Sequence, residues 1–284
     1  METHARVQGD NLDEKREGIT NIKPLLRLQN ISKSFGPVQA LSDITLDIYP
    51  GSVCGLVGDN GAGKSTLIKI IAGIIPPDSG DIIWENKKVH LHSPRDAADL
   101  GIATVYQDLA LCENLDVVQN MFLGREEKRR IFLDEISMEK KTLSTLASLG
   151  VTTVNSVRQL VASLSGGQRQ AVAVARAVMT NVKLVLMDEP TAALGVTQTK
   201  QVLDLVRKLA QNGIAVVFIS HNLNHVFEVA DRIAVLFHGR LVAEGSIKEL
   251  DTKLVVEYMS TGTVQPQGND IVRMPDSSTQ PNEG

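Results

Sequence analysis

The chain has 284 residues, 43% hydrophobic and 22% charged, a composition typical of a folded globular protein and unlike that of disordered or collagen-like chains. Lysine and arginine number 29 and aspartate and glutamate 33, so the net charge of −4 argues against a global basic field for binding nucleic acid. Cys54 and Cys112 lie far apart without a C-x-x-C partner, which disfavours a disulfide framework or a zinc module. The sequence shows no apolar run long enough for a membrane span and no N-terminal secretory signal, so we expect residence in the cytoplasm.

The two ends of the chain differ from its middle. Residues 1–24 are polar and charged without hydrophobic periodicity, and residues 261–284 are rich in Ser, Thr, Gln, Asn, Pro and Gly. Segments of this kind cannot bury enough apolar surface to compensate for the entropy lost on folding. We therefore predict flexible extensions at both ends and one folded domain over residues 25–260.

Within the predicted domain, short β-branched apolar runs alternate with segments of helical period. The runs are Val53–Val57, Ile102–Tyr106, Leu184–Met187, Ile214–Ile219 and Ile233–Phe237. They are continuously apolar, as expected of parallel strands that helices cover on both faces. The pattern predicts an α/β fold built on a mostly parallel sheet.

Helices are expected between several of these strands. One begins at Ser93-Pro94, where a capping serine precedes a proline in the first turn. Another covers about 198–212 and stops before Gly213. The stretch from residue 108 to about 165 contains helical pieces and no clear strand, so we predict a helical subdomain inserted between two core strands.

A glycine-rich loop follows the strand that ends at Val57. It reads Gly58-Asp59-Asn60-Gly61-Ala62-Gly63-Lys64-Ser65-Thr66 and precedes a helical run, the context that a phosphate-binding loop requires. Glycines let backbone N–H groups curl around phosphate oxygens, and the helix N-terminus adds a partial positive charge. Lys64 would neutralise the β- and γ-phosphates and Ser65 would ligate Mg²⁺. The alternative is an ordinary glycine turn, which the spacing disfavours.

Two adjacent acids, Asp188 and Glu189, end the strand Leu184–Met187. Acids at the carboxyl edge of a parallel sheet face the crevice where ligands bind. Because successive side chains diverge, we expect Asp188 to belong to the Mg²⁺ shell and Glu189 to accept a proton from the attacking water. Acids that merely cap a strand end are the alternative.

A second anion site is expected where residues 164–170, Leu-Ser-Gly-Gly-Gln-Arg-Gln, open a helix over Gln168–Val178. This motif resembles the Leu-Ser-Gly-Gly-Gln signature of the nucleotide-binding domains of ABC ATPases, and the resemblance extends over about residues 25–260. In that family two domains enclose two ATP molecules, each between the phosphate loop of one domain and the signature helix of the other. The resemblance therefore implies that Ser165, Gly166, Gly167 and Gln168 contact the ATP held by a partner domain.

Three further positions match ABC motifs. Gln107 matches the glutamine that senses Mg²⁺ and the γ-phosphate, His221 the histidine that contacts the γ-phosphate, and Phe35 the aromatic residue, usually Tyr, that stacks on adenine. The resemblance implies Lys64, Gln107, Glu189 and His221 as catalytic residues and Ser65, Gln107 and Asp188 as Mg²⁺ ligands. It also implies a phosphate-loop NTPase core with an antiparallel N-terminal β subdomain. The chain departs from the family at Gly195, where an aspartate at the dimer interface is common.

A narrower resemblance, to the ribose, xylose and fructose importer ATPases, rests on residues 92–97, 105–109, 120–125 and 220–223. It implies ATP-driven monosaccharide uptake at the cytoplasmic side of the membrane through separate permease subunits, with an extracytoplasmic sugar-binding protein as an indirect partner. The single copy of the domain resembles the short, fructose-type members, so we expect an ATP-bound homodimer. The alternatives are another cargo, such as an amino acid or lipid, and a soluble ABC ATPase acting on DNA or ribosomes, which the acidic charge disfavours.

Two other features have less specific interpretations. His221 and His225 are four residues apart and could share one helix face as metal ligands, but the glutamate of a zinc protease motif is missing between them. Lys128, Arg129 and Arg130 form a cationic triplet in the predicted helical insert. We expect a solvated face there, with contact to lipid headgroups or a partner as the alternative.

Overall fold

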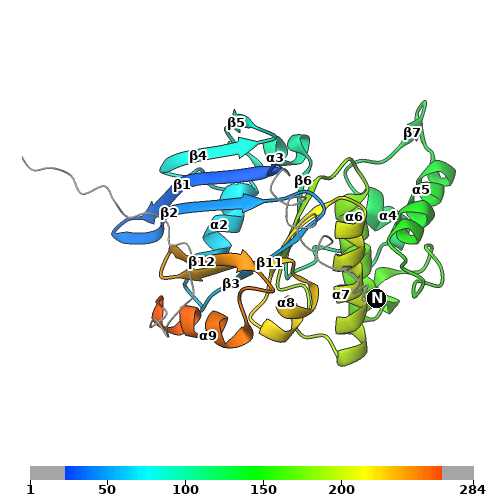
Figure 1. The fold of residues 1–284 in the computed structure, drawn as a ribbon. Helices are drawn as coiled ribbons and strands as arrows, with labels where there is room; N and C mark the ends of the chain where they lie inside the picture. The colour runs from blue at the N-terminus through cyan, green and yellow to red at the C-terminus, as the bar shows by residue number, and fades with distance from the viewer. Residues whose placement is uncertain (1–22, 264–284) are drawn as a thin grey trace, which may run out of the picture.

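The computed structural model of the chain describes residues 23–263 (Figure 1). The extensions predicted at residues 1–24 and 261–284 lie outside this range, apart from two or three residues at each boundary. The last element, α9 (Thr252–Thr261), ends at Gly262 in a left-handed conformation. None of the helices in the described part is long and apolar enough to cross a bilayer.

A six-stranded sheet forms the centre of the structure. Its order is β12 (Arg240–Ser246), β11 (Arg232–Phe237), β3 (Val53–Val57), β10 (Ala215–Ile219), β9 (Leu184–Asp188) and β6 (Ile102–Val105). All neighbours pair in parallel except β12, which is antiparallel to β11. The five predicted apolar runs are thus the five parallel strands, and the predicted α/β class is confirmed.

A second, four-stranded sheet is antiparallel throughout and confirms the expected N-terminal β subdomain. Its order is β2 (Val38–Ile48), β1 (Leu26–Phe35), β4 (Ser79–Trp84) and β5 (Lys87–Val89). Helix α2 (Lys64–Ile71) shares one apolar core with both sheets, and in Figure 1 it lies between them. The helix after the glycine-rich loop is therefore fixed by burial on two sides.

The other face of the central sheet packs against a second apolar core formed with α6 (Gly166–Val178), α7 (Val196–Gln211) and α8 (Leu223–Val229). Helix α7 is followed by Gly213 at φ 85°, as its sequence predicts. Helix α3 (Pro94–Leu100) begins at Ser93, whose hydroxyl accepts a hydrogen bond from the backbone N–H of Asp96.

Residues 108–165 form an insert between β6 and β9. It contains α4 (Val117–Phe122), α5 (Glu135–Ser148) and the short 3₁₀ turn η1 (Val161–Ser163). The insert also contains a hairpin of β7 (Lys128–Arg129) and β8 (Phe132–Leu133), where the sequence indicated no clear strand. Two-residue strands are too short to produce a periodic pattern. The cationic triplet therefore lies on a hairpin and its turn, and not on a helix.

Candidate functional site

The glycine-rich loop is held by the core on one side and is open on the other. Gly58 has φ 148°, and a Cβ there would lie 2.3 Å from the carbonyl oxygen of Leu236 in β11. Gly63 has φ 104°, and a Cβ there would lie 2.7 Å from the carbonyl oxygen of Ala40. Gly61, at φ 81°, has no neighbour within 4 Å of such a position. Glycine is thus required at both ends of the loop by contact, while its middle can accept a bound group.

Lys64, the first residue of α2, points its ammonium group back into this loop. Its Nζ donates to the carbonyl oxygens of Gly58 at 2.6 Å and Asp59 at 2.9 Å. Burial lowers the pKa of Lys64, whereas the neighbouring carboxylates of Glu189, Asp59 and Asp188 favour its charged form. A partly desolvated cation at a helix N-terminus is well placed to attract a polyphosphate.

The two acids stand at the end of β9, two strands from the loop. Asp188 pairs with Ile219 of β10, and burial followed by the nearby charge of Glu189 raises the pKa of Asp188. Glu189 has a left-handed backbone, φ 49°, and its N–H donates to the carbonyl oxygen of Ile219 at 3.0 Å. This unusual conformation for a non-glycine residue turns the Glu189 side chain away from the strand direction.

The Glu189 carboxylate meets His221. Nδ1 of His221 donates to Oε2 of Glu189 at 2.8 Å, and the side chains are 74% and 18% exposed respectively. The sequence predicts both residues as catalytic but does not indicate a bond between them, because this bond depends on β9 lying beside β10. A mostly buried carboxylate is thus oriented by an imidazole that is open to solvent.

His225 has different partners from those of His221. Asn222 Nδ2 donates to its Nε2 at 3.2 Å, which leaves Nδ1 as the donor to Thr191 Oγ1 at 3.0 Å. In the described part of the chain, three or more His, Cys, Asp or Glu side chains are nowhere grouped to hold a metal ion. His225 instead joins the loop that follows Glu189 to the start of α8, a link that sequence reasoning missed because no motif marks Thr191.

Gln107 and Phe35 flank the loop and the acids from two other elements. Gln107 follows β6 at the same carboxyl edge of the sheet, and its side chain is exposed and forms no hydrogen bond within the described residues. Phe35 ends β1 with 49% of its surface exposed. The β1–β2 hairpin is tied to the loop through Gly239, whose N–H donates to the carbonyl oxygen of Ala62 and whose carbonyl accepts from the N–H of Ser42. Four adjacent parallel strands thus end at the predicted site: β3 at the glycine-rich loop, β10 at His221, β9 at the two acids and β6 at Gln107.

The residues predicted to form a second anion site lie elsewhere in the same chain. Ser165 caps α6: its hydroxyl accepts from the N–H of Gln168 at 3.3 Å, and its own N–H donates to Gln168 Oε1 at 2.8 Å. A Cβ at Gly166 would lie 3.0 Å from Leu194, so this helix start packs on the loop that precedes α7. Among the described residues, no hydrogen bond joins Ser165–Gln168 to the phosphate loop.

Comparison with known proteins decides the family. The model of the ABC transporter family matches residues 41–192. The chain is 47% identical to the xylose/arabinose import ATP-binding protein of Sulfolobus acidocaldarius, over 84% of this chain and 94% of that protein. It is 45% identical to the fructose import ATP-binding protein of Rhizobium meliloti, over 86% of this chain and 96% of that protein. The chain belongs to the ABC transporter family.

Solved structures agree with this assignment. An ATP-binding cassette of an ABC transporter in its ADP conformation matches 84% of this chain and 99% of its own length, with a TM-score of 0.73 and 31% identity. A dimeric cassette in a post-hydrolysis state, bound to ADP and phosphate, matches 78% of this chain and 98% of its own length, with a TM-score of 0.65 and 26% identity. The fold is that of the ABC cassette, and the protein is an ABC ATPase.

The departure of this ABC ATPase from the common family pattern has no steric cause. Gly195 is the N-cap of α7, and nothing lies within 4 Å of a Cβ placed on it. The first side-chain carbon of an aspartate would therefore meet no neighbour there. The glycine removes a carboxylate from an exposed loop while leaving the packing of Leu194 against α6 intact.

A groove opens beside Gln107 between the ABC core and the insert. It has a volume of about 330 Å³, and β6, α3 and α6 contribute to its walls. Arg176 of α6 donates to the carbonyl oxygens of Ala110 and Leu109, and Arg125 donates to the carbonyl oxygen of Arg176. These bonds fix the backbone that follows Gln107 against the helix that begins at the signature motif.

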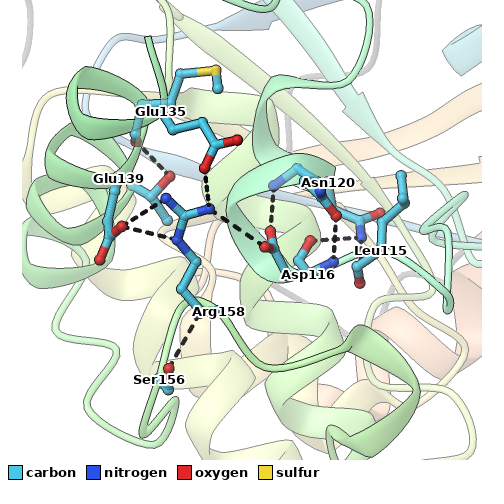
Figure 2. Close-up of polar contacts among 10 residues, drawn as sticks. Leu115, Asp116, Asn120, Glu135, Glu139, Ser156 and Arg158 are labelled. Carbon is cyan, nitrogen blue, oxygen red and sulfur yellow. Dashed lines mark hydrogen bonds and ion pairs between the residues drawn. The ribbon is translucent and has the colours of Figure 1, made fainter. Parts of the chain in front are cut away.

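Arg158 forms a separate set of contacts inside the insert (Figure 2). Its guanidinium lies 3.1 Å from Glu135, 2.8 Å from Glu139 and 3.7 Å from Asp116, the residue that caps α4. Nearby, the N–H groups of Val117 and Val118 donate to the carbonyl oxygens of Gln159 and Val157 respectively. One cation thus holds α4 and α5 to the segment that leads into Ser165.

We expect Arg158→Gln to loosen this part of the insert, because the change leaves three carboxylates together without their cation. Amide hydrogen exchange at Val117 and Val118 should accelerate by about fivefold or more, equivalent to about 1 kcal/mol in the opening free energy. Arg169→Gln is the matched control, since within residues 23–263 Arg169 pairs with a single carboxylate, that of Glu113, at 3.3 Å. Equal exchange rates in both variants would contradict the role given to Arg158.

Proposed function

We propose that this ABC ATPase powers the uptake of a monosaccharide of the ribose, xylose or fructose type through separate permease subunits. The observation that carries the proposal is the similarity to two sugar-import ATP-binding proteins over nearly their whole lengths, at 47% and 45% identity. Under this proposal the protein works at the cytoplasmic side of the membrane, and an extracytoplasmic sugar-binding protein delivers the cargo to the permease.

The proposed nucleotide chemistry is mainly positioning and electrostatic stabilisation. Amides of the loop from Gly58 to Gly63, together with Lys64 and Thr66 of α2, bind the phosphates, and Phe35 stacks on adenine. Glu189 accepts a proton from the attacking water while His221 holds its carboxylate in place. The open space at Gly61 and the half-buried Lys64 ammonium fit a triphosphate bound at this loop.

Mg²⁺ fits the same site. Two adjacent carboxylates, one with a pKa raised by burial and by its neighbour, carry negative charge that a divalent cation would neutralise. Ser65, Gln107 and Asp188 are the residues that would hold it. When bound, the ion would withdraw negative charge from the phosphates. Mg²⁺ prefers oxygen ligands, and the hydroxyl, amide and carboxylate groups of these side chains would supply them.

The proposed catalytic unit is a homodimer closed by ATP. In the described part of one chain the signature residues Ser165–Gln168 form their hydrogen bonds away from the phosphate loop, and under this proposal they contact the ATP held by a second copy. The similarity to a dimeric cassette bound to ADP and phosphate supports this arrangement. Hydrolysis then reopens the dimer and converts nucleotide state into motion.

The permease is proposed to dock in the groove beside Gln107. Residues 108–110 and Arg176 line it, so a helix inserted there would contact both the segment after Gln107 and the signature helix. This arrangement would let the permease sense the nucleotide state through Gln107 and α6.

The experiment that tests the cargo is uptake of labelled ribose, xylose, fructose, galactose and several amino acids in the host cell, with the native gene or with Glu189→Gln. We expect one sugar to be lost selectively in the variant. Loss of an amino acid would indicate the other-cargo alternative. Unchanged uptake of every compound, combined with active purified ATPase, would favour a soluble ABC ATPase.

A further inference from the structure

The β7–β8 hairpin presents the most exposed apolar side chains of the insert. Ile131 is 85% exposed and Phe132 73%, and Ile136 at the start of α5 is 71% exposed. Large apolar side chains clustered on one projection are unusual on a surface that contacts only water. The hairpin therefore has the character of a contact surface.

The charges of the hairpin are separated along its length. At the tip, Lys128, Arg129 and Arg130 are exposed, and none of them forms an ion pair with another described residue. At the base, the acids are engaged internally: Glu127 accepts from Ser137 Oγ at 2.7 Å and pairs with Lys141. The tip thus offers three cations beside apolar side chains, and the base retains its own negative charge.

The position of the β7–β8 hairpin relative to the groove beside Gln107 indicates which kind of partner it can reach. Arg125, three residues before β7, lines the groove beside Gln107. Figure 1 shows the hairpin projecting from the same edge of the molecule as α3, which also borders that groove, and β5. The hairpin therefore extends beyond the face on which the permease is proposed to dock.

We propose that the tip of the β7–β8 hairpin, Lys128–Phe132, binds the surface of a membrane that contains anionic lipids. Cations adjacent to exposed aliphatic and aromatic side chains match the layering of an anionic headgroup region over acyl chains. Unpaired cations at a protein interface would need acidic partners in fixed positions, whereas anionic lipids move to meet them. In Figure 1 the hairpin lies well apart from α2, the helix that begins at Lys64, so its test is independent of sugar uptake.

The test is co-sedimentation of the purified full chain with vesicles of phosphatidylcholine alone, or of phosphatidylcholine with about 30% phosphatidylglycerol. We expect binding to the anionic vesicles that weakens as NaCl rises from about 50 mM to about 500 mM. The triple change of Lys128, Arg129 and Arg130 to Ser should reduce the partition coefficient on the order of 100-fold, about fivefold for each cation. ATP hydrolysis without vesicles should be unchanged, which shows that the variant is folded.

The matched control changes Lys200, Lys248 and Lys253 to Ser, three exposed cations outside the insert, and should leave vesicle binding close to that of the native chain. A second variant, Phe132→Trp, adds an exposed tryptophan to a chain whose native tryptophan, Trp84, is buried. Its fluorescence should shift to the blue with anionic vesicles only. Absence of binding to anionic vesicles, or equal loss in both triple variants, would overturn the proposal. If the chain does not bind anionic vesicles, the hairpin tip would instead be a contact surface for a protein partner such as the permease.

Discussion

Glu189→Gln is expected to lower the rate of ATP hydrolysis by about 100-fold to 10,000-fold, because an amide cannot accept the proton of the attacking water. Binding should survive, since the loop and Lys64 that hold the phosphates are unchanged. The variant should therefore accumulate as an ATP-bound dimer. Phosphate release measures the first effect, and size-exclusion chromatography with and without ATP measures the second.

The control for this experiment is Glu85→Gln, which makes the same change of charge at an exposed carboxylate paired with Lys183. It should hydrolyse ATP at the native rate. Should Glu189→Gln also retain the native rate, the role of Glu189 as proton acceptor would be wrong. His221→Ala would then show whether the exposed imidazole acts without its carboxylate partner.

Gly58→Ala is expected to destabilise the fold by about 2–5 kcal/mol and to abolish ATP binding. The added Cβ would lie 2.3 Å from the carbonyl oxygen of Leu236, which cannot move without displacing β11. The backbone at φ 148° is also unfavourable for alanine. Urea denaturation reports the free energy of unfolding, and equilibrium binding of a fluorescent ATP analogue reports the state of the loop.

Gly61→Ala separates steric contact from backbone strain in the same loop. Its φ of 81° is also left-handed, but its Cβ would meet nothing within 4 Å. The loss of stability should therefore be about 1 kcal/mol, the cost of the backbone conformation alone. Equal urea midpoints for the two alanine variants would show that contact with β11 does not fix the loop.

Local patterns made several features predictable. The capping box of Ser165 and Gln168 and the glycine loop before Lys64 are specified by residues within a few positions of one another. Asp188 and Glu189 could be placed at a sheet edge because a buried strand of five residues precedes Glu189. These features involve short-range spacing, which sequence periodicity reports directly.

Features that depend on the arrangement of distant segments could not be predicted in the same way. The bond between Glu189 and His221 needs β9 beside β10, and the partners of Arg158 come from two helices that precede it by about twenty residues or more. The β7–β8 hairpin escaped detection because two-residue strands have no period. The assignment of roles within the nucleotide site remains a prediction for the experiments above.

The ammonium group of Lys64 is bonded to two carbonyl oxygens of its own loop, and this contact bears on selectivity among anions in the cell. Any anion that recruits this lysine must compensate for weakening those bonds. Chloride or inorganic phosphate offers few compensating contacts, whereas a triphosphate gains the loop amides and the helix N-terminus together. We therefore expect a triphosphate, which can meet these donors with several phosphate groups at once, to offset the loss of the lysine bonds more fully than a small anion can.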